Sequence, residues 1–419
     1  MRAYIAARTV NPFWAIDNRL EEKLDMQKVS IAAPSLALTI LVIAALFYSV
    51  GPAEPVSASG SPNNTFSSPA YVAGDATVEI IAVGLNNPRG LNFGPKGGLY
   101  VAEAGNGGAD ACGTAATGNP RPLVFYGPTG SIARLDLFEN TYERVITGLP
   151  SKAPVGGNEA TGPHDIVFKD GGQPYITTGW GADPRLRTSV CGAAGNSFAR
   201  LISARRNGSW YLQADIGAFE AAVNPHRDTV DSNPYGLLAD SSDERTVLVD
   251  AGANDLLSVN SNGKISVLAV FPNRLVPFGP PGNMIPMQAV PTSVARGPDG
   301  YYYVGQLTGF PFPVGGANVY RVRARGGTPT VYAGGFTNII DIAFGRYGEF
   351  YVLEYDKNGI LAPGAIGSLI RVAPDGTRTE LAPGMLTSPG GIAIGNDGAI
   401  YVTNKSVRNG LGEVLRITP

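Results

Sequence analysis

The sequence predicts an all-β fold: a six-bladed β-propeller closed by an N-terminal strand and preceded by one N-terminal hydrophobic helix. Three observations support this prediction. The 419-residue chain contains 55 Gly and 33 Pro but only 16% charged residues, a composition that favours short strands and tight turns over long helices. One pattern of paired strands recurs six times along the chain. A single long apolar run precedes all six copies.

The hydrophobic helix is expected at residues 29–50, which contain no charged side chain. A run of about 20 apolar residues matches the hydrocarbon core of a bilayer. Lys28 immediately before it indicates that residues 1–28 are cytoplasmic. Translation could instead start at Met26, in which case the preceding residues would be a mis-started segment. Residues 29–50 would then be the core of a signal peptide, cleaved after the small-residue pattern Val56-Ser57-Ala58. Cleaved signal peptide and uncleaved membrane anchor both stay open.

Both alternatives predict that the rest of the chain is exported. Residues 51–76 are rich in Ser, Pro and Asn and are predicted to be a linker, and residues 77–419 are predicted to form the propeller. The expected location is extracytoplasmic: secreted, periplasmic or anchored at the cell surface. The net charge of −2, without clustered Lys and Arg, argues against a nucleic-acid partner.

The repeated unit reads Pro-x-Gly, an alternating apolar strand, a Gly-containing turn and a second strand that begins with an aromatic residue. Alternating apolar positions have the period of a β-strand, and Asp-Gly pairs such as Asp299-Gly300 supply the positive φ of a hairpin turn. The fifth copy lacks the proline. The six copies span residues 88–103, 163–178, 234–250, 291–306, 339–354 and 389–404.

A second pair of strands follows most copies, at residues 131–147, 256–270, 318–333 and 368–382. Four strands in each of six units describe a six-bladed propeller. After the last copy only one strand remains, the terminal EVLRITP. Residues 77–84, TVEIIAVG, are therefore predicted to pair beside it and to close the ring, because closure removes both open sheet edges.

Three insertions enlarge blades 1 to 3, at residues 104–130, 179–197 and 216–231. The first two follow the second strand of their blade and should extend the same face. Cys112 and Cys191, the only cysteines, lie one in each. No CxxC or Cys/His spacing indicates zinc, so a disulfide formed in an oxidising compartment is the prediction.

Several segments are similar to known propellers. The repeat resembles the NHL-repeat and SMP-30/gluconolactonase superfamily. GLNNPRGLNFGPKGGLYVAEAG, TGSIARLD, VITGLPS, EATGPHDIVF and VLVDAGANDLLSV resemble the ScyD/ScyE family, named for bacterial pigment gene clusters, over nearly all of 77–419. The resemblance implies an exported propeller with a poorly defined biochemical activity, and it does not by itself imply a pigment enzyme.

The first strand of each blade should line a central channel, and its first residues should lie at the channel mouth. Candidate binding residues there are Arg89, His164, Asp165, Tyr235 and Asp341. Lactonases of the resembling superfamily place carboxylates and amides at such positions to hold a divalent cation. Asp165 and Asp341 could share a Ca²⁺ ion with waters and carbonyls, but two carboxylates fall short of that pattern and of the six to eight oxygens that Ca²⁺ takes. His164 is either an acid/base or binding group or a packing histidine.

A second set of polar residues closes the second strands of the blades. Glu103, Asp250 and Glu354 belong to it, and Asn254 follows in a turn. These residues could form a polar rim that binds a cation or a sugar-like ligand. The alternative is that they accept hydrogen bonds from nearby loop backbone, and Asn254 is then a turn former.

No catalytic set can be assembled, because neither histidine lies near a nucleophile motif such as GxSxG. The leading interpretation is an exported binding or accessory protein that holds a small molecule, glycan or protein on its loop-rich face and channel mouth. One alternative is a channel-mouth enzyme of lactonase, hydrolase or sugar-dehydrogenase type. Another is an envelope scaffold protein.

Overall fold

The computed structural model describes residues 71–73, 76–112, 123–169, 171–205, 207–240 and 244–419. The predicted hydrophobic helix at 29–50, the segment 1–28 and most of the linker 51–76 lie outside the described residues. None of the helices in the described ranges combines the length and the apolar character of a membrane span.

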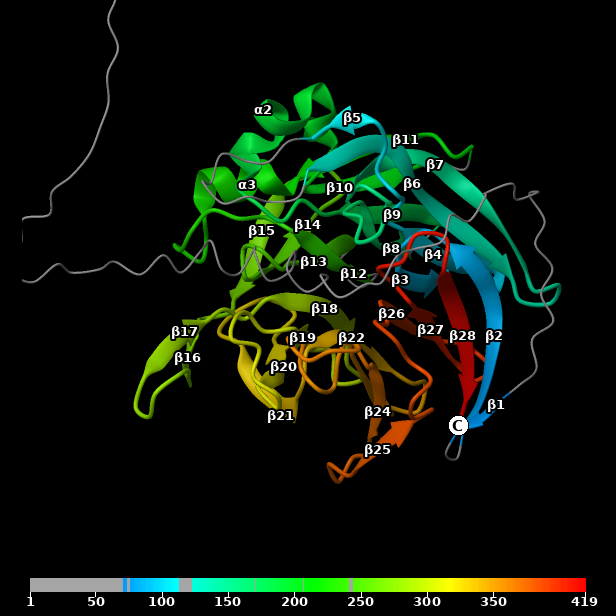
Figure 1. Cartoon of the computed structure of the whole chain (residues 1–419), viewed down its shortest axis with the longest axis vertical. Coiled ribbons are helices and arrows are strands. Elements are labelled where there is room, and N and C mark those ends of the chain that lie inside the picture. Colours follow the sequence, from blue (N-terminus) through cyan, green and yellow to red (C-terminus); the bar gives the residue numbers. More distant parts are fainter. Residues whose placement is uncertain (1–70, 74–75, 113–122, 170, 206, 241–243) are drawn as a thin grey trace, which may run out of the picture. The chain divides into compact units, whose positions relative to one another are not determined.

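Six antiparallel sheets surround a common centre, which confirms the predicted all-β propeller (Figure 1). Each innermost strand contacts those of the two neighbouring blades, and β26 contacts β3 to complete the circle. The innermost strands are β3 (Pro88–Phe93), β8 (Pro163–Lys169), β12 (Pro234–Asp240), β18 (Pro291–Arg296), β22 (Ile339–Phe344) and β26 (Gly391–Ile394).

Each blade continues outward through antiparallel strands. The second strands are β4 (Leu99–Glu103), β9 (Gln173–Thr178), β13 (Arg245–Asp250), β19 (Tyr302–Gln306), β23 (Phe350–Glu354) and β27 (Ile400–Asn404). The third strands are β6 (Val124–Asp136), β10 (Arg200–Ala204), β14 (Asp255–Val259), β20 (Ala317–Val322), β24 (Ser368–Val372) and β28 (Gly412–Thr418). The outer strands are β7 (Thr141–Pro154), β11 (Trp210–Asp215), β15 (Ile265–Val270), β21 (Thr330–Phe336), β25 (Arg378–Leu381) and β2 (Ala76–Leu85).

The turns between first and second strands have the predicted chemistry. Gly300 and Gly398 adopt φ values of 78° and 79° in their Asp-Gly turns. Positive φ costs glycine nothing, whereas a side chain would strain the turn. In the first blade the same turn contains the 3₁₀ segment η1 (Pro95–Gly97). Local sequence thus sets where each hairpin reverses.

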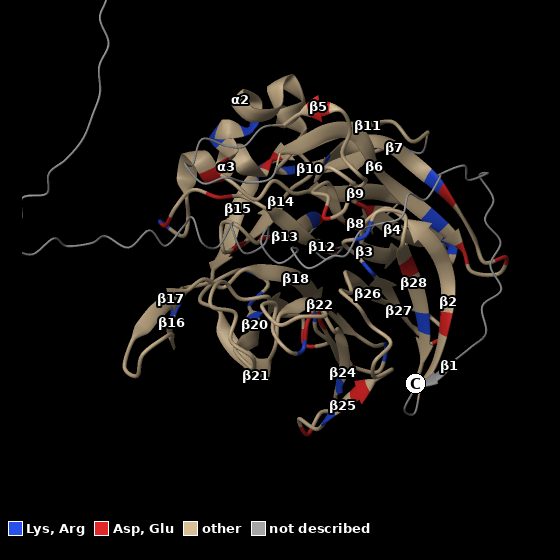
Figure 2. Ribbon diagram, in the orientation of Figure 1, with Lys and Arg blue, Asp and Glu red and all other residues tan. Residues whose placement is uncertain are grey.

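The N-terminal strand closes the ring as predicted. Strand β2 pairs antiparallel with β28, from Thr77 opposite Thr418 to Leu85 opposite Gly412. In Figure 1 the red C-terminal strand lies beside the blue β2, and Figure 2 shows an acidic position on β2 next to a basic one on β28. These are Glu79 and Arg416, whose charged atoms lie 3.1 Å apart. A further strand, β1 (Tyr71–Ala73), lies within the predicted linker segment and pairs with β2.

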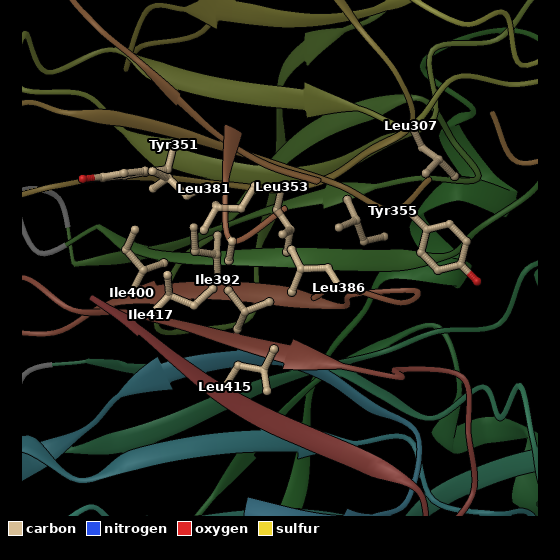
Figure 3. Packing of buried hydrophobic residues seen from close by; sticks show 14 of the residues in the cluster. Leu307, Tyr351, Leu353, Tyr355, Leu381, Leu386, Ile392, Ile400, Leu415 and Ile417 are labelled. Carbon is tan, nitrogen blue, oxygen red and sulfur yellow. The ribbon is translucent and has the colours of Figure 1, made fainter. Parts of the chain in front are cut away.

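Apolar side chains fill the space between blades. The largest cluster joins blades 5 and 6, where Leu353 on β23 packs with Ile392 on β26 and Leu415 on β28 (Figure 3). Leu353 and Leu415 are almost completely buried. Dense packing between neighbouring blades holds the inner strands in place.

Two of the three predicted insertions contain the α-helices of the described residues. Residues 179–197 form η2 (Pro184–Leu186), α2 (Arg187–Cys191) and η3 (Gly192–Ser197), and residues 216–231 begin with α3 (Ile216–Val223). Strand β5 (Asp110–Ala111) lies in the first insertion. The sequence did not predict a fourth insertion, the hairpin of β16 (Arg274–Pro277) and β17 (Met284–Met287) between blades 3 and 4. This hairpin contains Pro277 and Pro286 and does not follow the repeat pattern.

Candidate functional site

The structure brings Arg89, His164 and Tyr235 together where three successive inner strands begin. The His164 ring packs on the Tyr235 ring with a centroid distance of 4.5 Å. The Arg89 guanidinium lies close to both residues. Its charge disfavours the imidazolium of His164, whereas burial raises the pKa of Tyr235 and the Arg89 charge and a side-chain hydrogen bond from Arg89 oppose that rise. These three residues, together with Asp165 and Asp341, are called the channel-mouth cluster below.

His164 is held in one tautomer. Its Nδ1 lies 3.0 Å from the Pro234 carbonyl oxygen, and a carbonyl can only accept, so Nδ1 carries the proton. Burial, reinforced by the Arg89 charge, lowers the pKa of His164 to about 3. The ring is therefore neutral at physiological pH, with Nε2 as a hydrogen-bond acceptor. Gly179 permits this position, because a Cβ there would lie 2.0 Å from His164 Cε1.

Arg89 is the positive group of the cluster. Its Nη2 donates to the Ala160 carbonyl oxygen at 2.8 Å, which ties blade 1 to the loop that precedes β8. Its Nε is buried without a hydrogen-bond partner. A buried, unpartnered N–H of a guanidinium is unfavourable, so this atom is available to an acceptor brought by a ligand.

Asp165 and Asp341 are close enough for the Asp341 charge to act on Asp165, and both accept hydrogen bonds from backbone N–H groups. Asp165 accepts from Ile166 N at 2.8 Å and from Leu237 N of the next blade at 2.7 Å. Asp341 accepts in the same way from Ile342 N and from Ile392 N of the following blade. Both carboxylates therefore join neighbouring blades.

Burial dominates the electrostatics of these two carboxyls. It raises the pKa of Asp341 to about 7 and the pKa of Asp165 well above its usual value, the latter helped by the Asp341 charge. Gly90 makes room for Asp165, because a Cβ at Gly90 would lie 2.1 Å from Oδ1. No group of three His, Cys, Asp or Glu side chains within the described ranges is arranged to hold a metal ion.

Sequence reasoning missed two residues of the mouth. Burial raises the pKa of Glu159, in the loop before β8, to about 7, while the Arg408 and Arg89 charges oppose the rise. Tyr355 follows β23, and burial raises its pKa to about 12. Figure 3 shows Tyr355 at the edge of the apolar cluster with its hydroxyl pointing away from the other labelled residues. Its place directly after a second strand was the available signal, whereas no pattern marked Glu159.

The strand-end residues do not join this cluster, and each is engaged in its own blade. Glu103 accepts from Asn86 N at 2.8 Å and forms a bidentate pair with Arg144. Asp250 accepts from Asn233 N at 2.6 Å, and Glu354 accepts from Thr337 N at 2.7 Å. Each carboxylate thus holds the loop that leads into its own blade.

Asn254 has the geometry of a turn former. It adopts a φ of 58°. Its Oδ1 accepts from Val290 N at 2.8 Å, and its Nδ2 donates to the Gly252 carbonyl. Asn is one of the residues that tolerates the left-handed region, because its side chain can bond nearby backbone.

The insertions of blades 1 and 2 are joined to each other. Cys112 and Cys191 form the predicted disulfide, with Cα atoms 4.1 Å apart. Nearby, Lys152 Nζ lies 3.7 Å from the centroid of the Trp180 ring and donates to the Trp180 carbonyl at 2.8 Å. These cross-links restrain the loops on the face where the inner strands begin.

A groove lies elsewhere, where the turns of blades 6 and 1 meet. Its volume is about 430 Å³, and Glu79, Phe93, Leu137, Tyr401 and Arg416 are among its lining residues. Arg416 is already paired with Glu79 and Asp397 there. The charged side chains Glu79, Asp397 and Arg416 of this groove are thus paired with one another.

Comparison with known proteins yields structural likeness only. No protein-family model and no curated protein matches the chain, so the resemblance to the ScyD/ScyE family stays a prediction. A gluconolactonase from Xanthomonas campestris is 10% identical, with a TM-score of 0.48 over 88% of this chain and 99% of that one. A virginiamycin B lyase from Staphylococcus aureus is 12% identical, with a TM-score of 0.44 over 82% and 100% of the chains. A streptogramin B lyase is 14% identical, with a TM-score of 0.42 over 82% and 97%.

Proposed function

We propose that this chain is an exported binding protein that holds a small molecule with an acidic group at the channel mouth. The observation that carries the proposal is Arg89, whose Nε is buried without a hydrogen-bond partner while its charge acts on neutral His164 and on Tyr235. A carboxylate would satisfy that N–H with a charge-assisted hydrogen bond. The Cys112–Cys191 disulfide supports export, because such bonds persist in oxidising compartments.

His164 does not suit the role of a general base, although burial raises the pKa of Asp341 and of Glu159 to about 7. A general base works best with a pKa near the operating pH, whereas the pKa of His164 is lowered to about 3. The carboxylates that a lactonase-type metal would need, Asp165 and Asp341, each already accept two backbone N–H groups. The channel-mouth enzyme is therefore the weaker candidate.

The test uses matched pairs of carboxylates and their uncharged amides, namely acetate with acetamide, succinate with succinamide, and benzoate with benzamide. Thermal unfolding of the full chain is followed with each compound. At least one carboxylate should raise Tm, and its amide should not. Arg89→Gln should abolish that rise, and Arg89→Lys should weaken it, because lysine keeps the charge but loses the planar donor set.

Two results would contradict the proposal. One is an equal response of the wild type and Arg89→Gln to the same carboxylate. The other is hydrolysis of an aldonolactone that Asp165→Asn or Asp341→Asn abolishes, which would support the enzyme instead. Circular dichroism of each variant controls for loss of fold.

A further inference from the structure

The groove between blades 6 and 1 lies at the end of the blades remote from the channel mouth. Arg89, of the channel-mouth cluster, is near the start of β3, whereas Phe93 ends that strand and lines the groove. The groove volume of about 430 Å³ falls within the range of roughly 300–1,000 Å³ that small-molecule sites have. The groove is therefore large enough for a small ligand, and it is separate from the site proposed above.

A fixed polar network lines this groove. The Arg416 guanidinium donates through Nη1 to Glu79 at 3.1 Å and through Nη2 to Asp397 at 3.0 Å. Its Nε donates to the Tyr401 hydroxyl at 3.3 Å, and this hydroxyl donates to Asp397 at 3.4 Å. A guanidinium has five N–H groups, and the described residues take three of them. The other two can donate to a ligand, and the Glu79 and Asp397 side chains, which are 39% and 45% exposed, can accept.

Blade 4 contains the same network, covered there by aromatic rings. Asp299, in the equivalent Asp-Gly turn, accepts from the Tyr303 hydroxyl at 2.9 Å and from Arg321. Tyr332, on the outer strand β21, packs edge to face on Tyr303 with a centroid distance of 4.8 Å, and Phe350 lies beside Tyr332. The arrangement of aspartate, tyrosine and arginine is thus a feature of the repeat that secures the turn.

Two positions distinguish the groove from its counterpart in blade 4. Ile81 takes the place of Tyr332, since each is the extra residue of a β-bulge in the outer strand of its blade. Glu79 takes the place of Thr330, since each lies directly opposite the arginine of the network. Isoleucine is smaller than tyrosine and leaves room, and glutamate adds a carboxylate that blade 4 lacks at this position. Blade 6 therefore has an open polar groove where blade 4 has an aromatic filling.

The lining of the groove favours one class of ligand. An acidic ligand would meet the carboxylates of Glu79 and Asp397, and a cationic ligand would meet Arg416, so a neutral ligand suits the groove best. A hydroxyl both donates and accepts hydrogen bonds, which matches guanidinium N–H groups beside carboxylate oxygens. Phe93 and Leu137 add apolar surface to the lining. A sugar ring has hydroxyls at its edge and C–H groups on its faces, so it can use both kinds of lining.

We propose that this groove binds a neutral sugar ring. Glu79, Asp397 and Arg416 form hydrogen bonds with the sugar hydroxyls, and these bonds are strengthened because one partner is charged. Phe93 and Leu137 contact the C–H groups of the ring. Since the ligand carries no charge, it does not compete with the ion pairs that hold the network in place.

The test titrates the full chain with four neutral probes, the methyl glycosides of glucose, galactose, mannose and N-acetylglucosamine. Saturation-transfer difference NMR measures binding of each. At least one probe should bind with a Kd on the order of 1 mM, the affinity expected for a ligand of roughly 15 non-hydrogen atoms. Glucuronate and glucosamine, which carry a negative and a positive charge, should bind more weakly than that probe.

Variants that copy blade 4 into blade 6 test the groove itself. Ile81→Tyr should abolish binding, because it fills the space. Glu79→Thr should weaken binding about tenfold, because it removes a charged acceptor. Asp397→Asn should have an effect of similar size for the same reason. Asp299→Asn is the matched control, the same change in the equivalent turn of blade 4, and should bind like the wild type.

The proposal is wrong if none of the four neutral probes binds, or if glucuronate or glucosamine binds more tightly than all of them. It is also wrong if Glu79→Thr and Asp397→Asn retain wild-type affinity, or if Asp299→Asn weakens binding as much as Asp397→Asn. Circular dichroism checks the fold of each variant, and a folded Ile81→Tyr with wild-type affinity contradicts the proposal as well. Arg89→Gln should leave sugar binding unchanged, so this result is independent of the carboxylate test at the channel mouth.

Discussion

At the scale of single residues, burial changes the chemistry of His164. An exposed histidine has a pKa near 6.5 and titrates at physiological pH. Here burial and the Arg89 charge lower the pKa to about 3, while the Pro234 carbonyl selects the tautomer. The residue therefore offers a fixed neutral acceptor in place of a proton shuttle.

This shift predicts a pH-dependent stability. Between pH 6.5 and about 3 the unfolded chain binds a proton at His164 that the folded chain does not. The stability that depends on neutral His164 is thus fully present above pH 6.5 and is lost as the pH falls toward 3. In urea unfolding, His164→Gln should reduce the slope of this loss by up to about 1.4 kcal/mol per pH unit. An NMR titration of folded wild type showing an imidazole pKa near 6.5 for His164 would contradict it.

At the scale of elements, the strands of blade 1 are joined through a buried carboxylate. Glu103 on β4 is 0% exposed, and Arg144 on β7 neutralises it from a position only partly open to solvent. The ion pair links two strands that do not pair directly, because β6 lies between them. Replacing Arg144 with an uncharged residue would leave the buried Glu103 carboxylate without a counter-charge.

Arg144→Met should therefore lower the free energy of unfolding by about 2–3 kcal/mol. Adding Glu103→Gln should recover part of that loss, since the amide needs no counter-charge. The matched control is Arg134→Met, because Arg134 pairs with Glu143 at an exposed site where a salt bridge contributes less than about 1 kcal/mol. Equal losses for the two arginine variants, measured by denaturant unfolding, would refute the argument.

The disulfide acts at the same scale, between two insertions. Cys112 and Cys191 are separated by 79 positions in sequence. In the chain-entropy model, a cross-link of that span stabilises the fold by about 4 kcal/mol. Cys112→Ser combined with Cys191→Ser should accordingly lower Tm, and a reducing agent should lower the wild-type Tm without affecting the double variant. An unchanged wild-type Tm under reduction would speak against the bond.

At the scale of the whole molecule, one strand decides whether the ring is closed. Strand β2 completes blade 6, and its Leu85 is fully buried among residues of blades 1 and 6. Because each blade packs on two neighbours, loss of this contact exposes both ends of the circle. The terminal strand pair therefore stabilises more than its own sheet.

Leu85→Ala should lower the free energy of unfolding by about 3 kcal/mol. Phe138→Ala is the control, because Phe138 is 90% exposed in the turn between β6 and β7 and should change stability by less than about 0.5 kcal/mol. Guanidinium unfolding monitored by tryptophan fluorescence gives both values. If Leu85→Ala were as mild as the control, closure by β2 would not govern stability.

The sequence alone determined the number of blades, the closing strand and the turn positions, because these depend on local signals. Each of these signals is contained in a short stretch of sequence. Examples are the alternating apolar residues Leu91 and Phe93, the glycine of the Asp299-Gly300 turn, and the terminal strand EVLRITP, which has no following partner strand in the sequence. The repeat also predicted that Arg89, His164, Asp165, Tyr235 and Asp341 lie at one mouth, because equivalent repeat positions should meet at the axis.

Only the tertiary structure decided what those residues do. The pKa of His164 depends on burial and on Arg89, which lies 75 positions earlier in the chain, and the partners of Asp165 and Asp341 are backbone N–H groups of neighbouring blades. Desolvation and Coulomb interactions depend on distance in space, and repeat spacing in the sequence does not specify how side chains from different blades and insertions meet.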